Sequence, residues 1–108
     1  MRTKRHSPDR PVCFCGRIVF EFFNNDDEEF KVKTLRSLAK EVRKEINVSC
    51  VLIDEEEVEN PEKGVLVMAV VATNHDEGKA VLDKALAFLD GKAPARISAE
   101  DFEEAELS

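Results

Sequence analysis

The stretch "PVCFCGRIVFEFF" alternates between two kinds of side chain, and this alternation constrains the fold more than any other feature. Successive residues of a β-strand point to opposite faces of a sheet, so a period of two separates an apolar face from a mixed one. Gly16 falls on the apolar face, where a helix or a neighbouring backbone can approach closely. We therefore predict a strand with one buried face and one open face. The buried face carries Val12, Phe14, Ile18, Phe20 and Phe22, and the open face carries Cys13, Cys15, Arg17 and Glu21.

The remaining apolar patterns predict two helices and three further strands. An apolar stripe at helical spacing indicates a helix over 30–45, entered through the acidic run "NNDDEE", since acids are favourable at a helix N-terminus. A second helix ends at Gly91, and three residues before it are candidates to cap it: Thr73, Asn74 and Asp76. The segments "NVSCVLID" and "VLVMAVVA" have the composition of strands. The last segment, "ARISAEDFEEAEL", has a weaker strand pattern than the others. We expect an edge strand in its first part and a frayed end.

The predicted order is strand, helix, strand, strand, helix, strand. Two right-handed crossovers in this order give a ferredoxin-like α+β sandwich, with both helices on one face of a four-stranded antiparallel sheet. The other face is left for solvent, a partner or a second copy. A length of 108 residues suits one domain, which we place at 12–108, after a flexible basic tail at 1–11.

Charge is distributed unevenly along the chain. The net charge is −7, and because the first ten residues carry four cations against one acid, the remainder holds about −10. An acidic protein does not attract nucleic acid in bulk, although a local basic surface can. No apolar run reaches the roughly 20 residues of a membrane span, and no apolar stretch follows the basic start as in a secretory signal. We therefore expect a cytoplasmic protein, in which the three cysteines stay reduced.

The two neighbouring cysteines, Cys13 and Cys15, raise the question of a metal or redox site. Side chains two residues apart on a strand lie about 6.5–7 Å apart, which is too far for a disulfide while the strand is formed. A zinc site needs further ligands, and Cys50, His6 and His75 do not have zinc-site spacing. We interpret the cysteines as small packing residues and expect no metal and no cofactor.

No residue has the pattern of a catalytic centre. His75 and Asp76 form a conceivable acid–base pair, but no nucleophile, glycine-rich phosphate loop or metal cluster accompanies them, so a capping role is the simpler interpretation. The chain has neither Trp nor Tyr, and its strand phenylalanines belong to the buried face, which disfavours a base-stacking platform for RNA. We predict a protein that is not an enzyme.

Three segments resemble the YlxP-like family, a bacterial family of unassigned function. These are "INVSC", "VMAVVATN" and "VLDKALAFLD", and the similarity extends from about residue 12 to residue 107. The resemblance implies a ferredoxin-like fold and no established activity, and members often lie among genes for ribosome maturation and translation. The family usually shows Ser-Leu-Lys-Glu-Lys-Arg at the start of the first helix, whereas this chain has "DDEEFKV", with only Lys31 in common. The matching residues are Asn47, Val48, Ser49, Ala69, Val70, Val71, Asn74, Val81, Leu82, Lys84, Leu86 and Phe88.

The first helix carries a row of cations opposite its apolar stripe. At 100° per residue these cations fall within a sector of about 100°, with Glu41 and Glu45 to one flank. The row is either a solvated helix face or a surface for phosphate groups, assisted by the basic tail. The candidate RNA-binding residues are Lys33, Arg36, Lys40, Arg43 and Lys44 on the helix and Arg2, Lys4, Arg5 and Arg10 in the tail.

Two hypotheses of function remain. The first is a non-enzymatic binding protein that contacts ribosomal RNA or ribosome-maturation proteins through the helix and the tail. The second is a homo-oligomeric or small-ligand-sensing module that uses the open face of the sheet, where apolar side chains such as Val19 and Phe23 favour association, for example as a homodimer.

Overall fold

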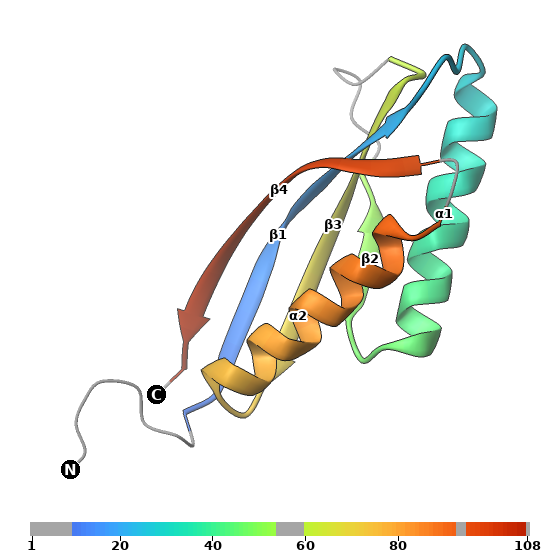
Figure 1. The fold of residues 1–108 in the computed structure, drawn as a ribbon. Coiled ribbons are helices and arrows are strands. Elements are labelled where there is room, and N and C mark those ends of the chain that lie inside the picture. The colour runs from blue at the N-terminus through green and yellow to red at the C-terminus, as the bar shows by residue number, and fades with distance from the viewer. Residues whose placement is uncertain (1–9, 54–59, 93–94, 108) are drawn as a thin grey trace.

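The computed structural model describes residues 10–53, 60–92 and 95–107. Four strands and two helices follow one another in the predicted order (Figure 1). This arrangement confirms the ferredoxin-like α+β fold. The elements are β1 (Val12–Phe22), α1 (Glu28–Glu45), β2 (Ser49–Leu52), β3 (Lys63–Ala72), α2 (His75–Asp90) and β4 (Ala95–Glu106).

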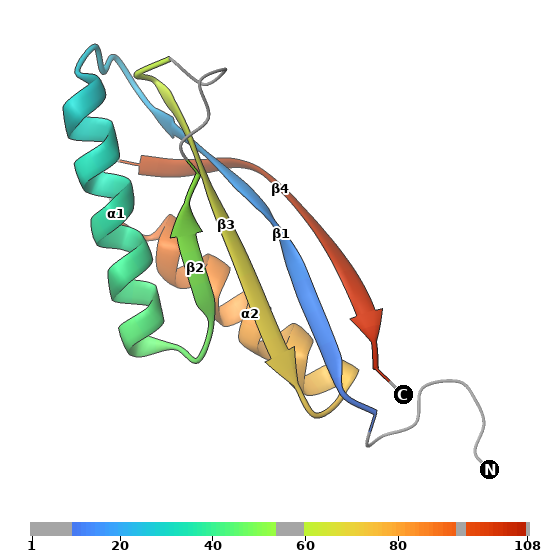
Figure 2. The same cartoon turned by 180° about the vertical axis from the view of Figure 1, so that it is seen from behind.

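All four strands join one antiparallel sheet in the order β2-β3-β1-β4. Helix α1 packs against β2 and β3, and α2 packs against β3, β1 and β4. Both helices pack on the same side of the sheet, since Leu35 of α1 lies against Gly64, and Gly78 of α2 lies against Phe14. The view from behind shows α2 beyond the strands and α1 beside β2 (Figure 2). One face of the sheet therefore builds the core, while the other is without a helix.

The side chains of β1 divide as their alternation predicts. Val12, Ile18 and Phe20 have no exposed surface, whereas Cys15 and Glu21 are exposed. Burying each large apolar side chain stabilises the fold by about 1.5–3 kcal/mol. The core is completed by residues from every other element, including Leu35, Leu38 and Val42 of α1, Leu66, Met68 and Val70 of β3, and Leu82 and Leu89 of α2.

Both helices begin at a side-chain cap. Asp27 accepts a hydrogen bond from the backbone of Phe30 at 3.2 Å, so α1 begins at Glu28, slightly earlier than predicted. Asn74 accepts one from Glu77 at 2.9 Å. Of the three cap candidates for α2 the structure thus uses Asn74, and His75 is the first helical residue.

The end of the chain differs from the prediction. The segment expected to fray is part of β4, which pairs with β1 along the whole of that strand, from Phe22↔Ala95 to Val12↔Glu106. A register shift between Val19 and Phe20 marks an irregularity in this pairing. The acidic composition suggested a weak strand, but β4 lies at the sheet edge, where charged side chains are common and discourage aggregation. The backbone groups on its inner edge pair with β1, which local composition does not report.

Gly16 allows β4 to approach β1 closely. A Cβ atom at this position would collide with the carbonyl oxygen of Asp101 and lie 2.6 Å from the Cα atom of Phe102. This confirms that a neighbouring backbone, here that of β4, comes close to the glycine.

We predict that Gly16→Ala lowers the free energy of unfolding by about 1–3 kcal/mol, because β4 has to move away from β1. Urea denaturation followed by circular dichroism measures the change. Gly91→Ala is the matched control, since its added Cβ would lie 3.5 Å from the nearest atom and its φ is −83°. Equal losses in the two variants would contradict the close approach.

Candidate functional site

The cations of the first helix lie together on its outer side. We call Lys33, Arg36, Lys40, Arg43 and Lys44 the basic face of α1. All five are exposed, whereas Leu35, Leu38 and Val42 on the opposite side are buried. The helix thus separates a basic surface from the core, as its periodicity predicts.

Arg43 has a structural role as well as an exposed charge. Its guanidinium donates a hydrogen bond of 2.6 Å to the backbone carbonyl of Cys50, which fastens α1 to β2. Arg43 and Lys44 also occupy the last turn of α1, where cations interact favourably with the helix dipole. Within the described residues, the other four cations of the basic face make no hydrogen bond or ion pair.

The tail is not placed beside the basic face by any described contact. Arg2, Lys4 and Arg5 lie outside the described residues. Arg10, the last cation of this segment, lies 3.4 Å from a carboxylate oxygen of Glu106, and the backbone of Leu107 donates to the carbonyl of Pro11 at 2.8 Å. The described end of the segment is therefore held at the end of β4, a strand that packs against α2.

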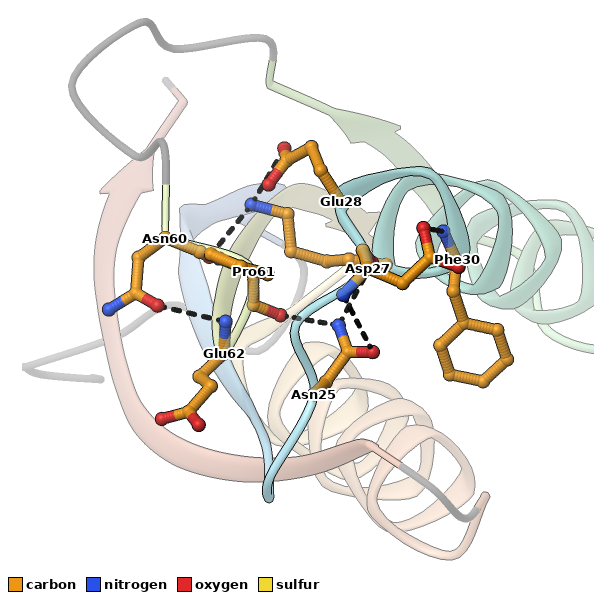
Figure 3. A network of polar contacts seen from close by, with 8 residues as sticks. Asn25, Asp27, Glu28, Phe30, Asn60, Pro61 and Glu62 are labelled. Atoms are coloured by element: carbon orange, nitrogen blue, oxygen red, sulfur yellow. Dashed lines mark hydrogen bonds and ion pairs between the residues drawn. The ribbon is translucent and has the colours of Figure 1, made fainter.

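Lys31, the basic residue shared with the YlxP-like pattern, is buried. Its ammonium group donates to the carbonyl of Asn60 at 3.0 Å and lies 3.0 Å from a carboxylate oxygen of Glu28. Figure 3 shows Asn60, Pro61 and Glu62 next to the first turn of α1, where Asn25 donates to the carbonyl of Pro61 at 2.7 Å. Lys31 therefore holds α1 to the segment before β3 and does not belong to the basic face.

The second candidate surface is the side of the sheet without helices, which we call the open face. Its exposed apolar residues include Val51, with 56% of its surface accessible, and Val71, with 66%. Phe23, just beyond the end of β1, is 91% exposed. The strand pairing assigns to this face Cys13, Cys15, Arg17, Val19 and Glu21 of β1, Ser49 and Val51 of β2, Lys63, Val65, Val67, Ala69 and Val71 of β3, and Arg96, Ala99, Asp101, Glu103 and Ala105 of β4.

The cysteines are divided between the two faces of the sheet. All three thiols are free; Cys15 is exposed and Cys13 partly buried on the open face, whereas Cys50 is in the core. Burial raises the pKa of the Cys50 thiol to about 11, although the nearby charge of Arg43 opposes this shift. Cys50 is thus a packing residue, and the other two thiols are part of the open face.

His75 joins the start of α2 to the end of β4. Its Nδ1 atom lies 2.7 Å from a carboxylate oxygen of Glu104, and its ring centroid lies 5.8 Å from that of Phe14. The hydrogen bond to Glu104 raises the pKa of His75 above 6.5, and the charges of Glu104, Asp76 and Glu106 raise it further, while burial opposes them. Sequence patterns missed this pair because it depends on β4 continuing past Glu104.

Two hollows of about 390 and 370 Å³ lie beside the helices. The first is lined by residues of α2 and the first half of β4, such as Leu86, Asp90 and Ile97. The second follows α1, past Phe30, Lys33 and Leu38, to Lys92. His75 lines neither hollow, so its pair with Glu104 is a link between two elements at the surface.

The chain matches a protein family described as "Protein of unknown function (DUF503)" over residues 31–102. It belongs to the DUF503 family. The DUF503 match begins in α1 and ends in β4, so it contains the whole basic face of α1 but not β1. The YlxP-like resemblance remains a prediction. A search of curated proteins gives no match.

Two solved structures are similar to this DUF503 chain in fold. One is the de novo designed protein Ferredog-Diesel, with 12% identity, a TM-score of 0.39, and coverage of 95% of this chain and 93% of the other. The second is a dimeric ferredoxin-like protein of unknown function from Thermobifida fusca YX. Its identity is 12%, its TM-score is 0.43, and the coverage is 91% and 92%. In the described part of the DUF503 chain, no helix is long and apolar enough to cross a membrane.

The link between His75 and Glu104 predicts a pH-dependent stability. Because the pKa of His75 is higher in the folded state than its ordinary value of 6.5, this contribution is fully present below pH 6.5 and is lost as the pH rises through the folded pKa. Urea denaturation at a series of pH values across this range measures the free energy of unfolding. NMR titration of the imidazole ring measures the pKa of His75 in the folded state. His75→Gln should remove this part of the pH dependence. A folded His75 that titrates at or below 6.5 would contradict the geometry.

Proposed function

We propose that the chain is a non-enzymatic binding protein that contacts RNA of the translation machinery in the cytoplasm through the basic face of α1. The YlxP-like resemblance supports this choice of partner, because members of that family often lie among genes for ribosome maturation. The proposal concerns ribosomal RNA itself or an RNA-containing complex of ribosome-maturation proteins.

The observation that carries the proposal is the unbroken positive charge along one side of α1. From Lys33 to Lys44 the helix rises about 16 Å, and no acid falls in the sector of the cations over this length. Glu41 lies on the flank, where it accepts a hydrogen bond from Ser37 at 3.2 Å. Lys33, Arg36, Lys40 and Lys44 are therefore presented to solvent without a neutralising partner among the described residues.

This arrangement suits contacts with phosphate groups rather than with bases. The major groove of an A-form duplex is too deep and narrow for side chains to read, so structured RNA is contacted mainly through its shape, its phosphates and its 2′-hydroxyl groups. A row of flexible cations on a rigid helix meets these requirements. The acidic remainder of the protein repels RNA, which would confine contact to the basic face.

A non-enzymatic role fits the pairing of His75, the conceivable acid–base residue of the sequence. Its ring is hydrogen-bonded to Glu104, and it lines neither of the hollows described above. Catalysis by general acid and base needs a group within hydrogen-bonding reach of a bound substrate.

We predict a salt-sensitive association with ribosomal subunits that depends on the basic face. In co-sedimentation at low and high salt, Arg36→Glu with Lys40→Glu should weaken binding tenfold or more. Losing two phosphate contacts should also reduce the slope of log affinity against log salt by about 1.8 for double-stranded RNA and by about 1.4 for single strands. The same binding assay with isolated ribosomal RNA distinguishes RNA from ribosomal protein as the partner.

Lys84→Glu is the matched control, because Lys84 is an exposed lysine of α2, on the other helix. It changes the net charge of the protein in the same direction, so general repulsion affects Lys84→Glu and Lys40→Glu equally. Binding that is insensitive to salt, or equally weakened by both single variants, would rule out the basic face as the RNA contact.

The open face favours a second candidate function, that of a self-associating or ligand-sensing module. Val51 is exposed on this face next to Val67, its cross-strand neighbour, and Val71 and Phe23 are exposed towards the two ends of the sheet. Exposed apolar side chains on a sheet face favour contact with another molecule.

A further inference from the structure

The centre of the open face is apolar. One row of side chains runs across the sheet through Val65, Val19 and Ala99, which are cross-strand neighbours; Ala99 is exposed, Val19 is partly buried, and Val65 is only 6% exposed in the single chain. Val67 and its neighbour Val51 extend the apolar surface towards β2. The backbone of Ile53, just after β2, donates to the carbonyl of Val65 at 3.3 Å, which places Ile53 at the end of the row. An antiparallel sheet can leave such a face to solvent, but an apolar stretch at its centre favours a partner.

Four charges flank this apolar row in an alternating pattern. On one side of the row, Arg17 of β1 is the cross-strand neighbour of Asp101 of β4. On the other side, Glu21 of β1 is the neighbour of Arg96 of β4. The order of the signs is therefore reversed between the two sides, with the cation on β1 in the first pair and on β4 in the second.

We propose that the open face binds a second copy of this chain, related by a two-fold axis that crosses the strands at the row of Val19. Such an axis sets β1 against β1 and β4 against β4 with the strand directions reversed. Arg17 then faces Glu21 of the other copy, and Asp101 faces Arg96 of the other copy. Every charge of the quartet meets an opposite charge, and the apolar row meets itself. This interaction surface does not rest on the proposed contact with RNA.

The same pattern disfavours other occupants of the open face. Its described charges balance, since Arg17, Lys63 and Arg96 are matched by Glu21, Asp101 and Glu103, so the face does not attract nucleic acid. Moving the axis to the row of Arg17 would set Arg17 and Asp101 against their own copies, and like charges in contact are costly. Arg17 has contacts in its own chain, and its five N–H donors allow it to serve more than one acceptor.

The size of the shared surface predicts the strength of the dimer. About the row of Val19, the two copies overlap over about eight residues of β1 and β4 but only over 63–67 of β3, and β2 ends before this row. The overlap is therefore roughly 23 Å along three strands that span roughly 14 Å. Each copy contributes roughly 300 Å², and the total of roughly 600 Å² is below the size of a stable, specific interface. We expect a weak dimer that dissociates on dilution.

Analytical ultracentrifugation of the full chain over a range of concentrations, up to about 1 mM, tests the proposal. The wild-type chain should show a concentration-dependent dimer. The double variant Arg17→Asp with Asp101→Arg keeps the cross-strand pair and the net charge of the chain, but it sets like charges against the second copy. Its dimer dissociation constant should rise tenfold or more. Adding Glu21→Arg and Arg96→Glu reverses the second pair as well. This variant with four substitutions should recover most of the affinity.

Two valine variants test the apolar row independently. Val19→Lys places a charge on the axis and should abolish the dimer, whereas Val71→Lys adds the same charge outside the overlap and should leave the dissociation constant within a factor of about two. Circular dichroism and thermal unfolding identify any variant that is not folded. If a charge-reversal variant does not fold, the two lysine variants decide whether the open face is the interface, and if a lysine variant does not fold, the charge reversals decide. A wild-type chain that stays monomeric at the highest concentration, a charge reversal without effect, or equal effects of the two lysines would overturn the proposal.

Discussion

The hydrogen bonding of β1 on both of its edges is the interaction on which the rest of the structure depends. β1 pairs with β3 from Val12 to Glu21 and with β4 from Val12 to Phe22, so it carries the sheet along its length. With both edges paired, its side chains can point only towards the helices or away from them. A shift of one residue would place Phe14, Ile18 and Phe20 in water, so burial fixes the register.

Two surfaces with different chemistry follow from this division. The side towards the helices is filled by the core, and α1, which covers β2 and β3, turns its basic face outwards. The other side presents valines, alanines and two thiols around a balanced set of charges. A dimer formed through the open face would leave the basic faces of both copies accessible, since the basic face of α1 points away from the core and α1 packs on the other side of the sheet. Self-association and contact with RNA are therefore compatible, and each copy would supply one row of cations.

Local periodicity was enough to predict much of this arrangement. The two-residue alternation identified the buried and open sides of β1, and helical spacing identified the core side and the basic face of α1, because these patterns depend only on neighbours in the chain. Pairing between distant segments was not visible in the same way. The acidic end of β4 is ordered by β1, His75 finds Glu104 only through that pairing, and Lys31 is buried through the carbonyl of Asn60.

The reactivity of the three thiols tests the division of the sheet most directly. In dilute protein, where the weak dimer is dissociated, Cys15 should react fastest with a thiol reagent and Cys13 should follow, since they lie on the open face. Cys50 is 1% exposed, and its pKa is raised to about 11. It should therefore react at least about 1,000-fold more slowly than Cys15, and only in molecules that have unfolded globally. Two accessible thiols and one protected thiol are the predicted result. Modification of Cys50 at the rate of the other two, or protection of Cys15 in dilute protein, would contradict the account.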